Sequence, residues 1–120
     1  MTKNYPQHYE KLVEMMGRLG AEAPEVMGGF SELHTAAGAD GALPVRIKEL
    51  IALAIAVVVR CDGCIAYHVH DALEAGATRA EILDAIGMAI LMGGGPAVVY
   101  GVEALEALDQ FEAEELAVPA

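Results

Sequence analysis

Apolar residues recur along the chain at the spacing of amphipathic helices rather than of strands. Between positions 9 and 19 they lie three or four residues apart, which predicts a first helix that ends at Gly20. Pro24 suits the first turn of a second helix, which ends near Gly38. β-Branched residues cluster only at 57–59, and Ala, Leu, Glu and Met dominate elsewhere. We therefore predict an all-α fold.

Proline, glycine and a capping box delimit the remaining helices. Thr78 and Glu81 have the spacing at which a hydroxyl and a carboxylate each bind a free amide at a helix start. The run Gly93-Gly94-Gly95-Pro96 should interrupt the chain before the last helix. No repeat or linker divides the sequence, so we expect one helical domain over residues 1–120. The predicted helices span about residues 9–20, 24–38, 44–59, 62–76, 79–92 and 97–115.

Charge and hydropathy exclude two classes of partner. With 18 acidic and 7 basic side chains, the net charge of −11 would repel phosphate backbones, so we expect no nucleic-acid partner. The longest apolar run, residues 50–59, is about half of the roughly 20 residues that cross a bilayer, so we expect no membrane span. Residues 1–20 show no signal-peptide pattern, which makes the cytoplasm the expected location.

The apolar content also bears on assembly. Apolar residues make up 55% of the chain, and several predicted helix faces consist of alanine and glycine, which bury little area each. The alternative is a tightly packed monomer. We expect a homo-oligomer, in which other subunits cover part of this surface.

The motif Cys61-Asp62-Gly63-Cys64, followed by His68, is the most informative for chemistry. These are the only two cysteines, so each can pair with the other, with a metal or across chains. If the fourth predicted helix begins here, its free amides favour the thiolate, which is the nucleophilic form. His68 follows Cys64 by four residues and Cys61 by seven, so one imidazole on the same helix face could serve either sulfur.

Glu49, on the preceding predicted helix, is a candidate partner for His68. If the chain reverses near residues 60–64, the two helices are antiparallel, and a carboxylate among apolar neighbours could pair with the histidine. The alternative is a solvated residue, or an ion pair with Lys48 or Arg46.

The same side chains could instead bind zinc, since Cys61, Cys64, His68 and Glu49 are all possible ligands. His70 points to another helix face and cannot easily join them. The usual structural-zinc pattern of two distant ligand pairs is absent, so we favour redox chemistry over a metal site or two idle buried thiols. We expect three histidines at the surface or its boundary, with no assigned role: His8, His34 and His70.

These residues resemble the carboxymuconolactone decarboxylase superfamily, specifically its alkyl hydroperoxidase D-like branch. The resemblance spans about residues 40–105. It rests on Glu49, Cys61, Cys64 and His68, followed in the family's order by Ala72, Gly76-Ala77-Thr78 and Glu81-Ile82. The resemblance implies an all-α fold that assembles as a homo-trimer or homo-hexamer, with thiol peroxidase or disulfide oxidoreductase activity and no bound cofactor.

By this resemblance, Cys64 would be the thiolate that attacks peroxide, Cys61 the resolving thiol, and His68 with Glu49 a proton relay. A hydroperoxide would be the substrate, and a thiol or dithiol the electron donor. The best-studied members also have a histidine between the cysteines, where this chain has Gly63. Two alternatives remain open: a non-catalytic metal-binding or assembly protein that uses the same ligands, and a decarboxylase or isomerase of a small carboxylic acid on the same fold.

Overall fold

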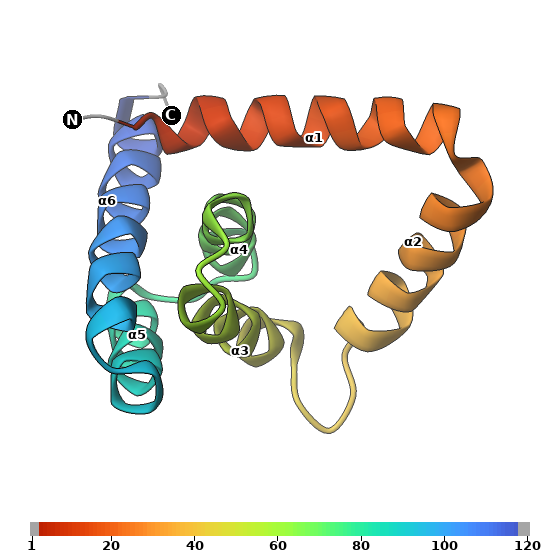
Figure 1. The fold of residues 1–120 in the computed structure, drawn as a ribbon. Helices are drawn as coiled ribbons and strands as arrows, with labels where there is room; N and C mark the ends of the chain where they lie inside the picture. Colours follow the sequence, from red (N-terminus) through yellow and green to blue (C-terminus); the bar gives the residue numbers. More distant parts are fainter. Residues whose placement is uncertain (1–2, 118–120) are drawn as a thin grey trace.

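The computed structural model describes residues 3–117, and the side chains of residues 3–115. This part of the chain forms six α-helices and no strand, so the prediction of an all-α fold with about six helices is confirmed. The helices are α1 (Tyr5–Glu22), α2 (Pro24–Gly38), α3 (Val45–Val58), α4 (Asp62–Glu74), α5 (Arg79–Gly93) and α6 (Gly95–Ala117) (Figure 1).

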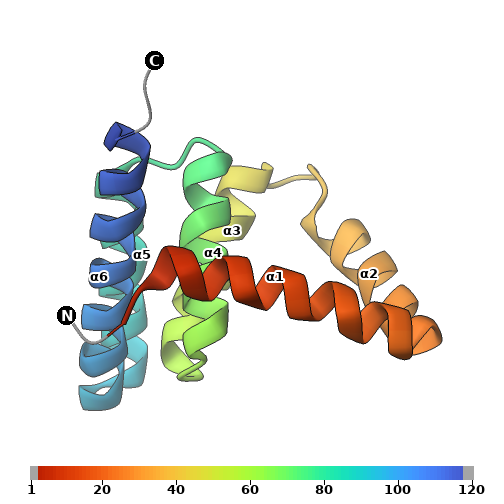
Figure 2. The same ribbon diagram turned by 90° about the horizontal axis from the view of Figure 1, so that it is seen from above.

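Helices α3 to α6 pack together around the apolar core, whereas α1 and α2 form an arm that extends away from them (Figures 1 and 2). Five fully buried side chains, contributed by all four packed helices, lie in that core: Leu53, Ile65, Val69, Ile82 and Leu108. Burying each such side chain contributes about 1.5–3 kcal/mol. The arm contacts the packed helices where α1 meets α4 and α6 and where α2 meets α3. One face of α4, the helix that follows Cys61, therefore packs into the core, and another contacts the arm.

Proline, not glycine, ends the first helix. The sequence predicted an end at Gly20, but α1 continues to Glu22 because a helix tolerates an interior glycine at a modest cost. Pro24 disfavours helical geometry at the residue before it, and Ala23 leaves the helix at φ −130°. At the other end, Asn4 caps the helix by accepting a hydrogen bond from the backbone N–H of Gln7.

The second half of the chain follows the predicted capping and breaking residues closely. Thr78 Oγ1 accepts from Glu81 N–H at 3.1 Å, and Glu81 Oε1 accepts from Thr78 N–H at 2.9 Å, which confirms the capping box. The break before α6 is shorter than predicted. Only Gly94, at φ 70°, lies between α5 and α6, because glycine adopts this left-handed region without strain. Helix α6 therefore begins at Gly95, with Pro96 in its first turn.

Large apolar side chains remain exposed over several helices of the isolated chain. Helix α2 has no buried residue. The most exposed of these side chains, each at least 59% accessible, are Val26, Leu33, Val59, Leu91, Met92, Val99 and Val102. Surfaces of this kind commonly mark contacts with other chains. No helix in the part of the chain that the structure describes has the length and hydropathy of a membrane span.

Candidate redox site

The two cysteines lie at the first turn of α4 and form a disulfide. Cys61 is the N-cap residue, and its sulfur accepts a hydrogen bond from the backbone N–H of Cys64 at 3.2 Å. Arg60, at φ 61°, makes the reversal between α3 and α4. The sulfurs therefore lie where unpaired amides and the helix dipole stabilise negative charge, as the sequence predicted.

Glu49 and His68 meet across the α3–α4 pair. His68 Nδ1 lies 2.8 Å from Glu49 Oε2, and the two side chains are only 22% and 13% exposed. The contact that the sequence left open is therefore present. Because Nδ1 faces the carboxylate, the other ring nitrogen, Nε2, is left for proton exchange elsewhere.

The alternative partners of Glu49 are engaged elsewhere. Lys48 donates to the backbone carbonyls that end α2, at 2.8 Å and 2.6 Å. Arg46 pairs with Glu81 of the capping box. The hydrogen bond from the Thr78 backbone and then the contact with Arg46 lower the pKa of Glu81. Glu49 is therefore neither a solvated residue nor a partner of its neighbouring basic side chains.

A cavity of about 250 Å³ opens over the disulfide. Helices α1, α2 and α4 supply its mostly apolar wall, which consists of Leu12, Met16, Phe30, His34, Cys61, Gly63, Cys64, Tyr67 and His68. A second cavity of about 420 Å³ shares Phe30, His34 and His68 with the first and reaches Glu49. His68 therefore lines both the cavity over the sulfurs and the cavity that reaches Glu49.

His34 is a site residue that the sequence did not identify. It is exposed, as expected, but it also lines both cavities, opposite the cysteine motif. Its ring lies edge-on to Tyr67 at 6.2 Å, and Tyr67 lies edge-on to His68 at 5.2 Å. Burial raises the pKa of Tyr67, which keeps its phenol neutral. No local pattern marks His34, because the fold of the arm brings α2 over the motif.

Asp62, between the two cysteines, anchors the start of the chain. The O–H of the fully buried Tyr5 donates to Asp62 Oδ1 at 2.8 Å and also contacts Glu103 of α6. Lys3 Nζ lies 3.4 Å from Asp62 and 3.0 Å from Glu103. Burial and the contact with Glu103 raise the pKa of Tyr5 far above its ordinary value. This cluster holds α1 and α6 to the cysteine turn.

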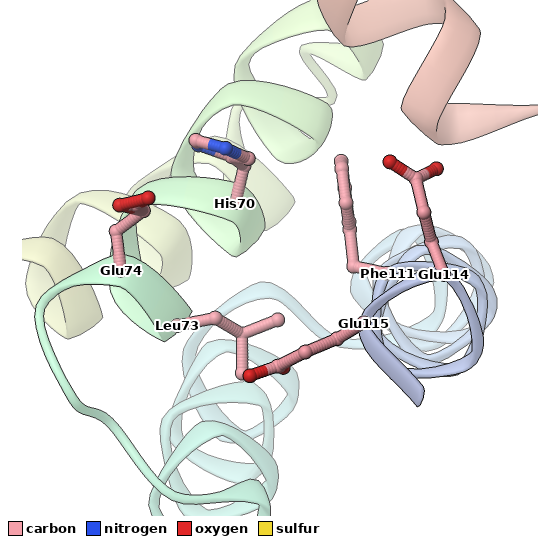
Figure 3. A pocket seen from close by; sticks show the side chains of 6 residues that line it. All are labelled: His70, Leu73, Glu74, Phe111, Glu114 and Glu115. Atoms are coloured by element: carbon pink, nitrogen blue, oxygen red, sulfur yellow. The ribbon is translucent and has the colours of Figure 1, made fainter. Parts of the chain in front are cut away.

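His70 lies away from the cysteines, as predicted. Its ring stacks on Tyr9 at 3.9 Å, and Nδ1 lies 2.9 Å from Asp71 Oδ1. Figure 3 shows the separate pocket that it lines with Leu73, Glu74, Phe111, Glu114 and Glu115, between α4 and α6. Within the described residues, no three or more His, Cys, Asp or Glu side chains are grouped so as to hold a metal ion.

The fold is all-helical, and its Cys-x-x-Cys turn lies beside a histidine–glutamate pair. Comparison with known protein families identifies the family with these features. The carboxymuconolactone decarboxylase family model matches residues 24–107, and the chain belongs to that family. The resemblance seen in the sequence starts at about residue 40. The family match starts earlier, at residue 24, and therefore includes α2.

Relatives of this chain span nearly its whole length. An uncharacterised protein of Cupriavidus necator is 37% identical over 113 residues, which cover 94% of this chain and 100% of that protein. A carboxymuconolactone decarboxylase family protein from Legionella pneumophila is 44% identical in sequence. Its crystal structure matches with a TM-score of 0.86, and the match covers 89% of this chain and 96% of that chain. A family member from Thermotoga maritima is 27% identical, and its involvement in an antioxidative response is suggested. Its structure matches with a TM-score of 0.82 over 89% of this chain and 92% of that chain.

Tyr5→Phe should destabilise the protein by about 1.5–3 kcal/mol, because it removes a hydrogen bond to charged carboxylates. Because folding raises the pKa of Tyr5, its contribution is complete below the unfolded pKa of about 10 and is lost as pH rises above it. Urea unfolding at pH 7 and pH 10.5 should therefore show a larger loss of stability with alkali for the wild type than for Tyr5→Phe.

Tyr100→Phe is the matched control, because the Tyr100 hydroxyl makes no hydrogen bond to the described residues. It should change the unfolding free energy at pH 7 by less than about 0.5 kcal/mol. Equal effects of the two substitutions would show that the Tyr5 hydroxyl does not anchor the cysteine turn.

Proposed function

We propose that this protein is a thiol oxidoreductase that reduces hydroperoxides or exchanges disulfides through Cys61 and Cys64. The observation that carries the proposal is the disulfide at the first turn of α4, in a cavity that it shares with the Glu49-paired His68. The Thermotoga maritima relative supports it through its suggested antioxidative role. A reducing cytoplasm would be the natural compartment for such a pair.

In the proposed cycle, the Cys64 thiolate attacks the terminal oxygen of a hydroperoxide. The O–O bond breaks, the alkoxide takes up a proton to leave as an alcohol, and Cys64 becomes a sulfenic acid. Cys61 then attacks the Cys64 sulfur, loses its proton, and displaces hydroxide, which leaves as water. The resulting disulfide is the state seen in the structure. A thiol or dithiol donor supplies two electrons and two protons to reduce it.

His68 and Glu49 are suited to the proton transfers in this cycle. An imidazole can accept and return a proton near neutral pH, and the attack on peroxide needs both steps. Glu49 holds the ring through Nδ1, which leaves Nε2 for these proton transfers. The apolar wall from Leu12, Met16 and Phe30 would accommodate the carbon chain of an organic hydroperoxide.

The first test concerns the two thiols. One equivalent of hydroperoxide should remove two free thiols per chain from the reduced protein, with no added mass. Cys64→Ser should abolish peroxide consumption, whereas Cys61→Ser should stop after one turnover with a sulfenic acid on Cys64. Sulfenic-acid trapping with mass spectrometry checks this assignment. A sulfenic acid on Cys61 of the Cys64→Ser protein would reverse the roles.

The second test concerns the histidine–glutamate pair. His68→Ala should raise the apparent pKa of the Cys64 thiol by about one unit and slow its alkylation at pH 7. Glu49→Gln should give a smaller change in the same direction, and the double variant should resemble His68→Ala because the two groups act as one unit. Alkylation rates from about pH 5 to pH 10 provide the measurement. An unchanged profile in His68→Ala would assign activation of the sulfur to the helix terminus alone.

The proposal includes assembly as a closed homo-oligomer of three or six chains. It is supported by the exposed apolar side chains of α2, α5 and α6, which an isolated chain would leave in water. The arm that covers the disulfide carries some of these side chains, so assembly would also affect the wall of the cavity.

Light scattering should therefore give a mass several times the 12.6 kDa of one chain. Leu91→Glu places a charge on the exposed face of α5 and should reduce that mass. Lys11→Glu is the control, because it changes the charge of an already solvated side chain in α1 and should leave the mass unchanged. A wild-type monomer at micromolar concentration would contradict the assembly.

A further inference from the structure

His8 lies over the centre of the cysteine motif, although it comes from a different helix. A Cβ atom placed on Gly63 would be 3.8 Å from His8 Nε2 and 3.5 Å from Leu12 Cδ2. On the other side of the ring, His8 Nδ1 lies 3.7 Å from Asp62 Oδ2. The imidazole from α1 therefore occupies the space beside both residues that separate the two cysteines.

The position of His8 matters for the thiols because the ring lies beside the Asp62 carboxylate. A carboxylate on a residue between two cysteines disfavours thiolate at either one, because like charges repel. Its two oxygens meet different partners. Oδ1 accepts a hydrogen bond from the Tyr5 O–H and lies 3.4 Å from Lys3 Nζ, which also contacts Glu103. Oδ2 faces His8. At 3.7 Å the His8 contact is longer than a direct hydrogen bond, and it is an ion pair only when the ring is protonated.

Positive charge is scarce in this chain, which has 7 basic and 18 acidic side chains. In the described residues, the only basic side chains within ion-pair distance of Asp62 are Lys3 and His8. Tyr5 also borders His8, with the two rings stacked at 6.3 Å. Of the groups that surround Asp62, His8 is the one whose side-chain type changes charge between about pH 5 and 8.

We propose that His8 is a second imidazole of the thiol site, which offsets the Asp62 charge and so favours thiolate in the reduced protein. It is a positioning residue, since it acts on the sulfurs through the local charge rather than by contact with them. The inference deepens the proposed function and rests on Cys61 and Cys64 being its reactive thiols. The site then has an imidazole–carboxylate pair on each side: Glu49 with His68, and Asp62 with His8.

The test compares thiol alkylation by iodoacetamide in the reduced full-length protein across pH. His8→Gln should raise the apparent thiol pKa by about half a unit to one unit and slow alkylation at pH 6 by about three- to tenfold. His8→Lys restores a positive charge and should alkylate at pH 6 at least as fast as the wild type. His70→Gln is the matched control, because His70 lies in the separate pocket of Figure 3, and it should match the wild type.

A wild-type measurement makes the test independent of folding in the variants. By linkage, if His8 favours thiolate, then thiolate favours the charged form of His8. The NMR shifts of the His8 ring protons should therefore titrate at higher pH in the reduced protein than in the disulfide form. Identical titrations in the two forms would overturn the proposal, as would wild-type alkylation in folded His8→Gln, or alkylation of His8→Lys as slow as that of His8→Gln.

These measurements need neither a hydroperoxide nor an electron donor. If the thiol count after hydroperoxide fails while the His8→Gln shift is present, the proposed reduction of hydroperoxides is wrong and the role of His8 stands. If the thiol count succeeds while His8→Gln alkylates as the wild type does, the activity stands and the role of His8 is wrong.

Discussion

The packing of α3 against α4 is the constraint on which the site depends. Leu53 and Val57 of α3 and Ile65 and Val69 of α4 are fully buried in the same core, so neither helix can rotate or slide without opening it. That rigidity fixes the 2.8 Å contact between His68 and Glu49, whose side chains leave the two helices on the cavity side. The same pair of helices sets the reversal that places Cys61 at the N-cap of α4.

In a strongly acidic chain, unpaired carboxylates beside a cysteine would disfavour its thiolate form. Two carboxylates near the cysteine turn illustrate how such charges are paired. Glu49 meets His68, and Asp62 meets Tyr5, Lys3 and His8. Without these contacts, repulsion within the site would oppose the stabilisation that the start of α4 provides. Among the Lys and Arg side chains in the described part of the chain, Lys3 is the one that contacts a carboxylate of the cysteine turn, whereas Arg46 and Lys48 have partners elsewhere.

The sequence predicted the features that local residues determine and missed those that depend on the arm. Helix starts at Pro24 and Thr78 and the cysteine–histidine spacing follow from nearby residues, and the contact between Glu49 and His68 required only one chain reversal. The end of α1 was misplaced because a glycine is a weaker helix stop than a following proline. The positions of His8 and His34 could not be predicted, since these residues precede Cys61 by 53 and 27 positions and reach the motif only through the fold of the arm.

The arm therefore connects the chemistry of the site to the surface of the molecule. Helices α1 and α2 bury few side chains of their own, yet they supply Leu12, Met16, Phe30 and His34 to the wall above the disulfide. Because few buried contacts hold this wall, its conformation depends on what else packs against α1 and α2. The exposed apolar face of α2 suits contact with another subunit. In such an assembly the packed helices would fix the reactive groups, and the subunit contact would fix the shape of the space in which they act.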